Sequence, residues 1–219
     1  MGVEFRPNKY EAWYKTPKGR FVDTLEKKVI ADLCRIRGGD KVLEIGCGTG
    51  HFSTYFKELG AEVVGLDTSP EMLQVAKDLR GELKIDLSRG DAYHLPFADN
   101  SFDLVAMITT LEFIPSPKKA LDEAFRVSKG KVFLGILNRN SLLAWKRKRS
   151  GKKVWQEAHF YSLKEVREIL GKDKQIKWKS VVHLPLVNSD FAFNMRLSLE
   201  NWLSRLRLLF GAFIGVLAE

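Results

Sequence analysis

The chain has 219 residues, of which 45% are hydrophobic and 29% charged, and this composition fits a globular protein with a full core. Cys34 and Cys47 are its only cysteines and form no C-x-x-C pair, which disfavours zinc and dithiol chemistry and favours a reducing compartment. Residues 1–7 lack the apolar core of a signal peptide, and the apolar run 206–218 is too short to cross a bilayer. We therefore expect one cytoplasmic domain without a transmembrane segment, as a monomer or weak dimer.

The net charge of +9 is unevenly distributed along the chain. Residues 1–110 hold 15 Lys and Arg against 17 Asp and Glu, whereas residues 111–219 hold 21 against 10. This excess of positive charge indicates either a solvated surface or attraction of an anionic substrate, a nucleic acid or a membrane surface. The charge pattern alone leaves these alternatives open.

The first elements in the chain are expected to be helical. Residues 10–19 are rich in aromatic side chains and predict a short helix and a turn that fold over a pocket. Over 21–37, apolar residues recur at steps of three and four, which predicts a helix that ends at Gly38 and Gly39.

Strands and helices then alternate along the chain. The near-continuous apolar run 102–108 is typical of a parallel strand buried on both faces, and Ser69 and Pro70 indicate a helix start. This alternation predicts an α/β fold with an open, doubly wound sheet. Strands are expected at 41–45, 62–67, 84–90, 102–108 and 131–137, and helices at 50–59, 70–79 and 117–127.

The last third of the chain is less regular. Ser162 and Glu165 form a capping box, which predicts a helix over 162–170. The other elements expected here are a helix over 141–148, a strand over 175–184, a helix over 198–207 and a closing strand over 208–217.

The expected architecture is a Rossmann-like, doubly wound sheet of seven strands, mostly parallel with an antiparallel last strand. Residues 1–37 are expected to form a helical lid and residues 38–137 a cofactor-binding core. Residues 138–219 are expected to complete the sheet and carry insertions on the substrate side.

The most informative segment is the loop after the first strand. Residues 41–50 (KVLEIGCGTG) place glycines at 46, 48 and 50, and the next apolar run ends at Asp67. Glycines let the backbone approach a ligand, and the Asp67 carboxylate can accept two hydrogen bonds from a ribose diol. The third glycine comes one residue earlier than in the dinucleotide fingerprint, because His51 stands in its place, and this disfavours a diphosphate cofactor.

Four segments together resemble the motifs of class I S-adenosylmethionine (SAM)-dependent methyltransferases. The similarity is greatest to the branch that acts largely on small molecules, the methyltransferase domain 11 type. It is strong over residues 10–137 and only general beyond them. The four segments are 44–50, 66–73, 90–97 and 101–105, in the order of the family.

The resemblance implies an enzyme that transfers a methyl group from SAM and releases S-adenosylhomocysteine. It implies that Glu44 lies near the ammonium of SAM, Asp67 at the ribose hydroxyls and Asp91 at the adenine amine. The other cofactor-binding positions that it implies are Gly46, Cys47, Gly48, Thr68, Met72, Ala92, Ile108 and Thr109, the last two beside the sulfonium.

Methyl transfer from a sulfonium is an in-line displacement that positioning alone accelerates strongly, so we expect no metal and no covalent nucleophile. A general base matters only where the acceptor must lose a proton. Glu112 is the first candidate, because it follows the strand at 102–108, where the acceptor normally approaches; the alternative is an exposed acid. His159 is the second candidate, with Tyr14 and His183 behind it, and a structural role is the alternative for His159.

We expect a small-molecule acceptor, either anionic or lipophilic. Two groups of aromatic residues are expected to form an apolar lid over it. These are Tyr10, Trp13 and Tyr14 on the substrate side near the N-terminus, and Phe191, Phe193 and Trp202 in the segment 185–208.

RNA is the alternative acceptor. The stretch 146–153 carries six cations between Trp145 and Trp155, which suits phosphates and stacked bases. The opposing interpretation is a surface loop whose tryptophans pack inward, because Trp145 is in phase with Leu142. The loop 108–111 lacks the Asn/Asp-Pro-Pro-aromatic signature of enzymes that methylate amide or exocyclic base nitrogens, which disfavours DNA and glutamine as acceptors.

Overall fold

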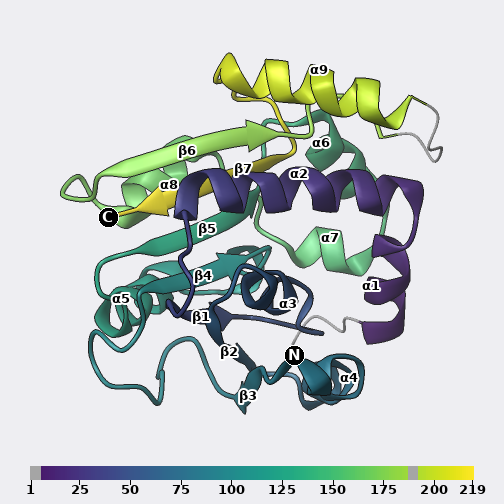
Figure 1. Ribbon diagram of the computed structural model, residues 1–219. Coiled ribbons are helices and arrows are strands. Elements are labelled where there is room, and N and C mark those ends of the chain that lie inside the picture. The colour runs from purple at the N-terminus through teal and green to yellow at the C-terminus, as the bar shows by residue number, and fades with distance from the viewer. Residues whose placement is uncertain (1–5, 187–191) are drawn as a thin grey trace.

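Seven strands form one sheet in the computed structural model, which describes residues 6–186 and 192–219 (Figure 1). The strand order is β3-β2-β1-β4-β5-β7-β6. The first five strands in this order are parallel to one another, and β7 runs antiparallel to both β5 and β6. The predicted Rossmann-like sheet with an antiparallel last strand is confirmed. The strands are β1 (Lys41–Ile45), β2 (Glu62–Asp67), β3 (Asp86–Arg89), β4 (Leu104–Ile108), β5 (Val132–Leu137), β6 (Ile176–Val181) and β7 (Phe213–Ala218).

Helices cover both faces of this sheet, as double winding requires. The described helices are α1 (Pro7–Tyr14), α2 (Pro17–Cys34), α3 (His51–Glu58), α4 (Pro70–Arg80), α5 (Pro117–Val127), α6 (Leu142–Arg149), α7 (Lys153–Glu157), α8 (Leu163–Leu170) and α9 (Phe193–Arg205). Two 3₁₀ turns, η1 (Gly81–Leu83) and η2 (Leu111–Phe113), complete them.

The interior strand β5 shows that the sheet is buried on both sides. All six of its residues are buried. Its side chains alternate between the two faces, so Phe133 joins the cluster under α2 and α3, while Val132 and Leu134 join the cluster under α5 and α8. The apolar runs of the sequence are therefore core strands of a parallel sheet.

Several element boundaries differ from those that the sequence predicts, and the helix α7 has no counterpart among the predicted elements. The helix α2 ends at Cys34, before Gly38 and Gly39, because Arg35 adopts a left-handed conformation with φ of 48°. The helix α9 begins at Phe193 rather than at residue 198. The strand β7 begins at Phe213 rather than at residue 208, because the side-chain amide of Asn138 binds the carbonyls of Leu209 and Gly211 and holds this segment outside the sheet.

A buried hydrogen bond between a carboxylate and an imidazole fastens α9 to the sheet edge. Glu200 of α9 is fully buried; it accepts a hydrogen bond from the N–H of Leu184 at 2.6 Å and pairs with Nδ1 of His183 at 3.0 Å. Burial raises the pKa of Glu200, but the hydrogen bonds from His183 and Leu184 outweigh it and the net pKa is lowered. His183, a candidate base, is thus occupied in a contact with α9.

Glu200→Ala should lower the free energy of unfolding by about 2 kcal/mol, because it leaves the His183 ring and the Leu184 N–H buried without their acceptor. Urea denaturation measures this change. The exposed Glu168→Ala, on α8, serves as control and should change stability by less than about 0.5 kcal/mol. Equal stability of the two variants would contradict this role of Glu200.

Candidate functional site

Acidic side chains lie along the carboxyl edge of the parallel strands. Glu44 lies in β1, Asp67 ends β2, and Asp91 follows β3. Because neighbouring parallel strands end at the same edge, the fold brings these three predicted cofactor residues together.

Asp67 holds two turns of this edge in place. Its Oδ2 accepts the N–H of Gly48 at 2.8 Å, and its Oδ1 accepts the N–H of Ser69 at 2.8 Å. The hydroxyl of Ser69 in turn accepts the N–H of Met72 at 3.2 Å and caps α4. One carboxylate therefore connects the glycine loop to the turn that contains Thr68.

The glycine loop requires glycine for steric reasons. Gly46 has a φ of 73°, and a Cβ there would overlap the side chain of Thr110. Gly48 also has a positive φ, of 54°, and a Cβ there would meet only the sulfur of Met72, at 3.9 Å. The backbone at Gly48 is therefore open to a ligand. Between them, Cys47 is buried, and burial raises the pKa of its thiol, which makes the thiol unreactive.

Glu44 is a carboxyl group buried beneath the glycine loop. It is 1% exposed and accepts a hydrogen bond from the hydroxyl of Ser53. Burial and, to a smaller extent, the negative charge of Asp67 raise its pKa to about 8, against the hydrogen bond from Ser53. A cationic group beside Glu44 would favour its ionised form.

The remaining predicted cofactor positions lie on the same edge. Ala92 is buried, whereas Asp91 is exposed and accepts the N–H of Tyr93 at 3.0 Å. Ile108 ends β4 and is buried, and Thr109 has a φ of 48° with its N–H bound to the carbonyl of Gly135 at 2.7 Å.

Glu112 lies in η2, directly after β4, and is only 2% exposed, so its interpretation as an exposed acid is wrong. Its Oε1 accepts the N–H of Leu137 at 2.5 Å, while its Oε2 has no hydrogen-bond partner among the described residues. Burial raises the pKa of Glu112 to about 7, although the hydrogen bond from Leu137 and the charge of Arg147 act to lower it. The site thus holds a carboxyl group that can change protonation near neutral pH.

His159 contacts Glu112 through a backbone hydrogen bond. Its N–H donates to the carbonyl of Glu112 at 2.8 Å, while its ring is 54% exposed and lies 3.1 Å from Arg139 and 3.6 Å from Glu165. The backbone brings the two catalytic candidates together, but the His159 ring lies at the surface. A catalytic role of His159 stays a prediction.

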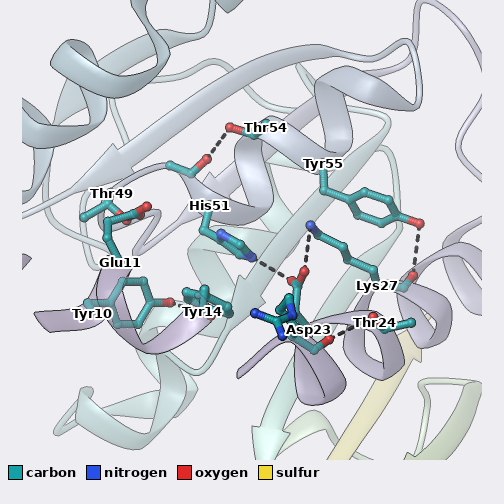
Figure 2. Close-up of polar contacts among 12 residues, drawn as sticks. Tyr10, Glu11, Tyr14, Asp23, Thr24, Lys27, Thr49, His51, Thr54 and Tyr55 are labelled. Carbon is teal, nitrogen blue, oxygen red and sulfur yellow. Dashed lines mark hydrogen bonds and ion pairs between the residues drawn. The ribbon is translucent and has the colours of Figure 1, made fainter. Parts of the chain in front are cut away.

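The helix α1 lies over the glycine loop (Figure 2). Glu11 of α1 accepts hydrogen bonds from the hydroxyl of Thr49 at 2.5 Å and from the guanidinium of Arg80 at 2.8 Å. Arg80 also donates from Nε to the carbonyl of Gly50 at 3.0 Å. These contacts fix α1 to the carboxyl edge of the sheet that carries Glu44, Asp67 and Asp91, which we call the cofactor edge. The sequence gives no signal for them because their partners lie 38 and 69 residues apart.

Aromatic contacts complete this attachment. The Tyr14 ring stacks on His51 with ring centroids 3.6 Å apart, and its hydroxyl lies 3.0 Å from that of Tyr10. His51 also pairs with Asp23 of α2 at 2.6 Å, as Figure 2 shows. Trp13, half-buried, packs against the cluster under α2 and α3. The residue that replaces the third fingerprint glycine is therefore a contact between α1, α2 and α3.

The predicted apolar lid does not include Trp202, which is 55% exposed on α9. Phe193 packs edge-on against Phe21 with ring centroids 5.7 Å apart, and Phe191 lies outside the described residues.

The basic stretch is the helix α6 followed by α7. Trp145 and Leu142 are 56% and 61% exposed, so the inward packing expected for Trp145 is wrong; the buried residue of α6 is Ala144 instead. Trp155 is half-buried, and the Arg147 guanidinium lies over its ring at 4.5 Å from the centroid.

Arg147 is a cation of this stretch that points into the protein. Burial lowers its pKa, while the charges of Glu26 and Glu112 act to raise it. Glu26 of α2 is itself buried, and burial raises its pKa to about 8. Glu26, Glu112 and Tyr14 thus lie close enough to Arg147 to act on its charge. Sequence reasoning missed Glu26 and the inward direction of Arg147.

Comparison with known proteins identifies the class. The family model described as a methyltransferase domain matches residues 43–134. A solved SAM-dependent methyltransferase from Thermotoga maritima, described as a possible histamine N-methyltransferase, aligns with 96% of this chain and 94% of its own, at 26% identity and a TM-score of 0.73. The chain belongs to the class I SAM-dependent methyltransferases; it is an enzyme, and SAM is its cofactor.

Two relatives are similar in sequence. An uncharacterized protein of Methanocaldococcus jannaschii is 35% identical over 176 residues, which is 78% of each chain. The demethylmenaquinone methyltransferase of Paenarthrobacter aurescens is 41% identical over 103 residues, which is 47% of this chain and only 40% of that protein. The second similarity is thus confined to less than half of either protein. In the described residues, no helix is both long and apolar enough to span a membrane.

Glu112→Gln should make the stability of the protein less sensitive to pH. The folded-state pKa of about 7 lies above the ordinary value of 4.5, so wild type loses stability as pH rises from about 4.5 to 7, when only the unfolded chain ionises. The difference in unfolding free energy between variant and wild type should therefore shift in favour of the variant by about 2.5 kcal/mol between pH 5 and pH 8. Urea denaturation at pH 5 and pH 8 measures it, and a constant difference would contradict the burial of an ionisable Glu112.

Proposed function

We propose that this methyltransferase acts on a small-molecule acceptor that binds at the carboxyl end of β4, beneath α1, and gives up a proton to Glu112. The observation that carries this proposal is the free, buried Oε2 of Glu112 directly after that strand. A buried polar atom without a partner is costly in a folded protein, so an acceptor that supplies the missing hydrogen bond offsets that cost.

The residues at the strand edge suit SAM in charge and in hydrogen-bonding capacity. We assign Glu44 to the ammonium, Asp67 to the ribose diol, and Asp91 with Ala92 and Met72 to adenine. Gly46, Cys47, Gly48 and Thr68 would line the cofactor with backbone groups, and Ile108 and Thr109 would border the sulfonium. The raised pKa of Glu44, about 8, supports this assignment, because an ammonium group would restore its charge.

Bound SAM would supply an activated methyl group, and its sulfur–carbon bond would break as the bond from methyl to acceptor formed. The acceptor supplies the electron pair and loses its proton to the Glu112 carboxylate. The pKa of about 7 supports this role, since a general base works best near the ambient pH. Positioning supplies the rest of the acceleration, and α1 would exclude water from the reacting groups.

A small-molecule acceptor also agrees with the names of the similar proteins. The relatives named above include a demethylmenaquinone methyltransferase, and the Thermotoga maritima structure is described as a possible histamine N-methyltransferase. Both names refer to small organic acceptors. The inward Arg147 and the two buried carboxyl groups near it support an acceptor with a polar reacting group.

The test follows radiolabelled methyl groups from SAM into a cell extract separated into a small-molecule filtrate, RNA and protein. Label should enter the filtrate, and Glu112→Gln should slow this transfer about 100-fold while SAM still raises the melting temperature as in wild type. Glu168→Gln, exposed on α8, is the matched control and should behave as wild type. Label in the RNA fraction would contradict the small-molecule acceptor, and undiminished transfer by Glu112→Gln would remove Glu112 from the reaction.

A further inference from the structure

The helix α9 exposes a face of apolar residues to solvent and buries two polar residues against the protein. Residues 195, 199, 202 and 206 share one face of the helix because they recur at steps of four, three and four. They are Met195, Leu199, Trp202 and Leu206, with exposed fractions of 68%, 44%, 55% and 50%. The opposite face buries Glu200 and Ser204. A surface helix of a globular protein normally has the reverse orientation.

The contacts that attach α9 to the rest of the protein fix this orientation. Glu200 pairs with His183, Phe193 packs on Phe21, and Leu197 packs against the cluster under α2 and α3. Rotating the apolar face inward would expose Phe193 and Leu197 and break the Glu200–His183 pair. The outward apolar face is therefore a stable property of the fold.

Exposed apolar side chains are concentrated in this region of the molecule. Ten large apolar side chains are exposed in the described part of the chain, and all but Leu79 and Leu83 lie on α6, on α9 or in the turn after α9. Besides Met195, Leu199, Trp202 and Leu206, they are Leu142 and Trp145 of α6 and Leu209 and Phe210 of the turn.

The turn after α9 lies beside the start of α6. Asn138 donates to the carbonyls of Leu209 and Gly211 in the turn after α9. Its own carbonyl accepts the hydroxyl of Ser141, the cap residue of α6. Figure 1 shows α9 across the top of the molecule with α6 just below it.

Positive charge surrounds these apolar side chains. Lys146 and Arg149 are exposed on α6, and the Arg149 guanidinium lies 4.9 Å from the centre of the Trp145 ring. Arg205 and Arg207 are exposed beside Leu206. Tryptophan, leucine and phenylalanine interleaved with arginine and lysine are typical of segments that lie in the interface of an anionic bilayer.

We propose that the surface formed by α6, α9 and the turn 206–211 docks on an anionic lipid membrane. Two alternatives fit the surface less well. A nucleic acid could bind the cations and stack on the aromatic rings, but it offers no apolar environment that would bury the methionine and leucines of α9. A second copy of the chain would bring the cations of two such surfaces together, which like-charge repulsion opposes. The proposal is independent of the identity of the acceptor.

The test is co-sedimentation of the full chain with vesicles of phosphatidylcholine and phosphatidylglycerol in equal amounts, and with vesicles of phosphatidylcholine alone. Wild type should bind the anionic vesicles at least tenfold more strongly, and less strongly in high salt. Both Leu199→Asp/Trp202→Asp and Lys146→Glu/Arg149→Glu should lose at least tenfold in binding. The matched control is Leu79→Asp, an exposed leucine of α4, which should bind as wild type.

SAM binding, measured by the shift in melting temperature, should be the same in all these proteins and shows that the variants are folded. Failure of wild type to bind anionic vesicles would overturn the proposal, as would equal binding by Leu199→Asp/Trp202→Asp. Binding to RNA that only the charge variant weakens, without vesicle binding, would assign the surface to nucleic acid. A dimer that the apolar variant dissociates, without vesicle binding, would assign it to a second copy.

Discussion

The cofactor edge depends on the carboxylate of Asp67, which accepts the backbone N–H groups of Gly48 and Ser69 at the same time. These two bonds join the glycine loop after β1 to the turn before α4, two segments that the sheet places side by side through the β1–β2 pairing. Gly46 and Gly48 can then hold their left-handed conformations without a side chain in the way. The shape of the cofactor edge follows from this one group.

Around this edge the fold buries several carboxyl groups that do not help to stabilise the core. Glu44, Glu26 and Glu112 are each no more than 5% exposed, and burial raises the pKa of all three toward neutrality. Such groups are destabilising unless something binds them, which is typical of functional sites. Here they gather beneath α1, whose Glu11 fixes the helix to Thr49 and Arg80. The helix α9 also places residues against the usual pattern, because it buries Glu200 and Ser204 while one of its faces exposes apolar side chains.

Local signals explain which parts of the structure the sequence predicts well. The capping box of Ser162 and Glu165 needs only a four-residue stretch, and both of its hydrogen bonds are formed. The apolar strands and the glycine loop are equally local, so the sheet and the cofactor edge follow from them. Long-range pairs have no such signal: the Glu11–Arg80 contact spans 69 residues. Helical phase misled for the short helix α6, whose Trp145 is exposed. Aromatic composition misled for α9, which buries Glu200 and exposes Trp202.

The central claim is that Asp67 both organises the edge and holds the ribose of SAM. Titration calorimetry of SAM into wild type and Asp67→Asn tests it most directly. An amide keeps one acceptor oxygen for the backbone but loses the charge that strengthens hydrogen bonds to a diol, so the account predicts affinity lower by about tenfold to a hundredfold with the fold retained. Unchanged affinity for SAM in a folded Asp67→Asn protein would contradict it.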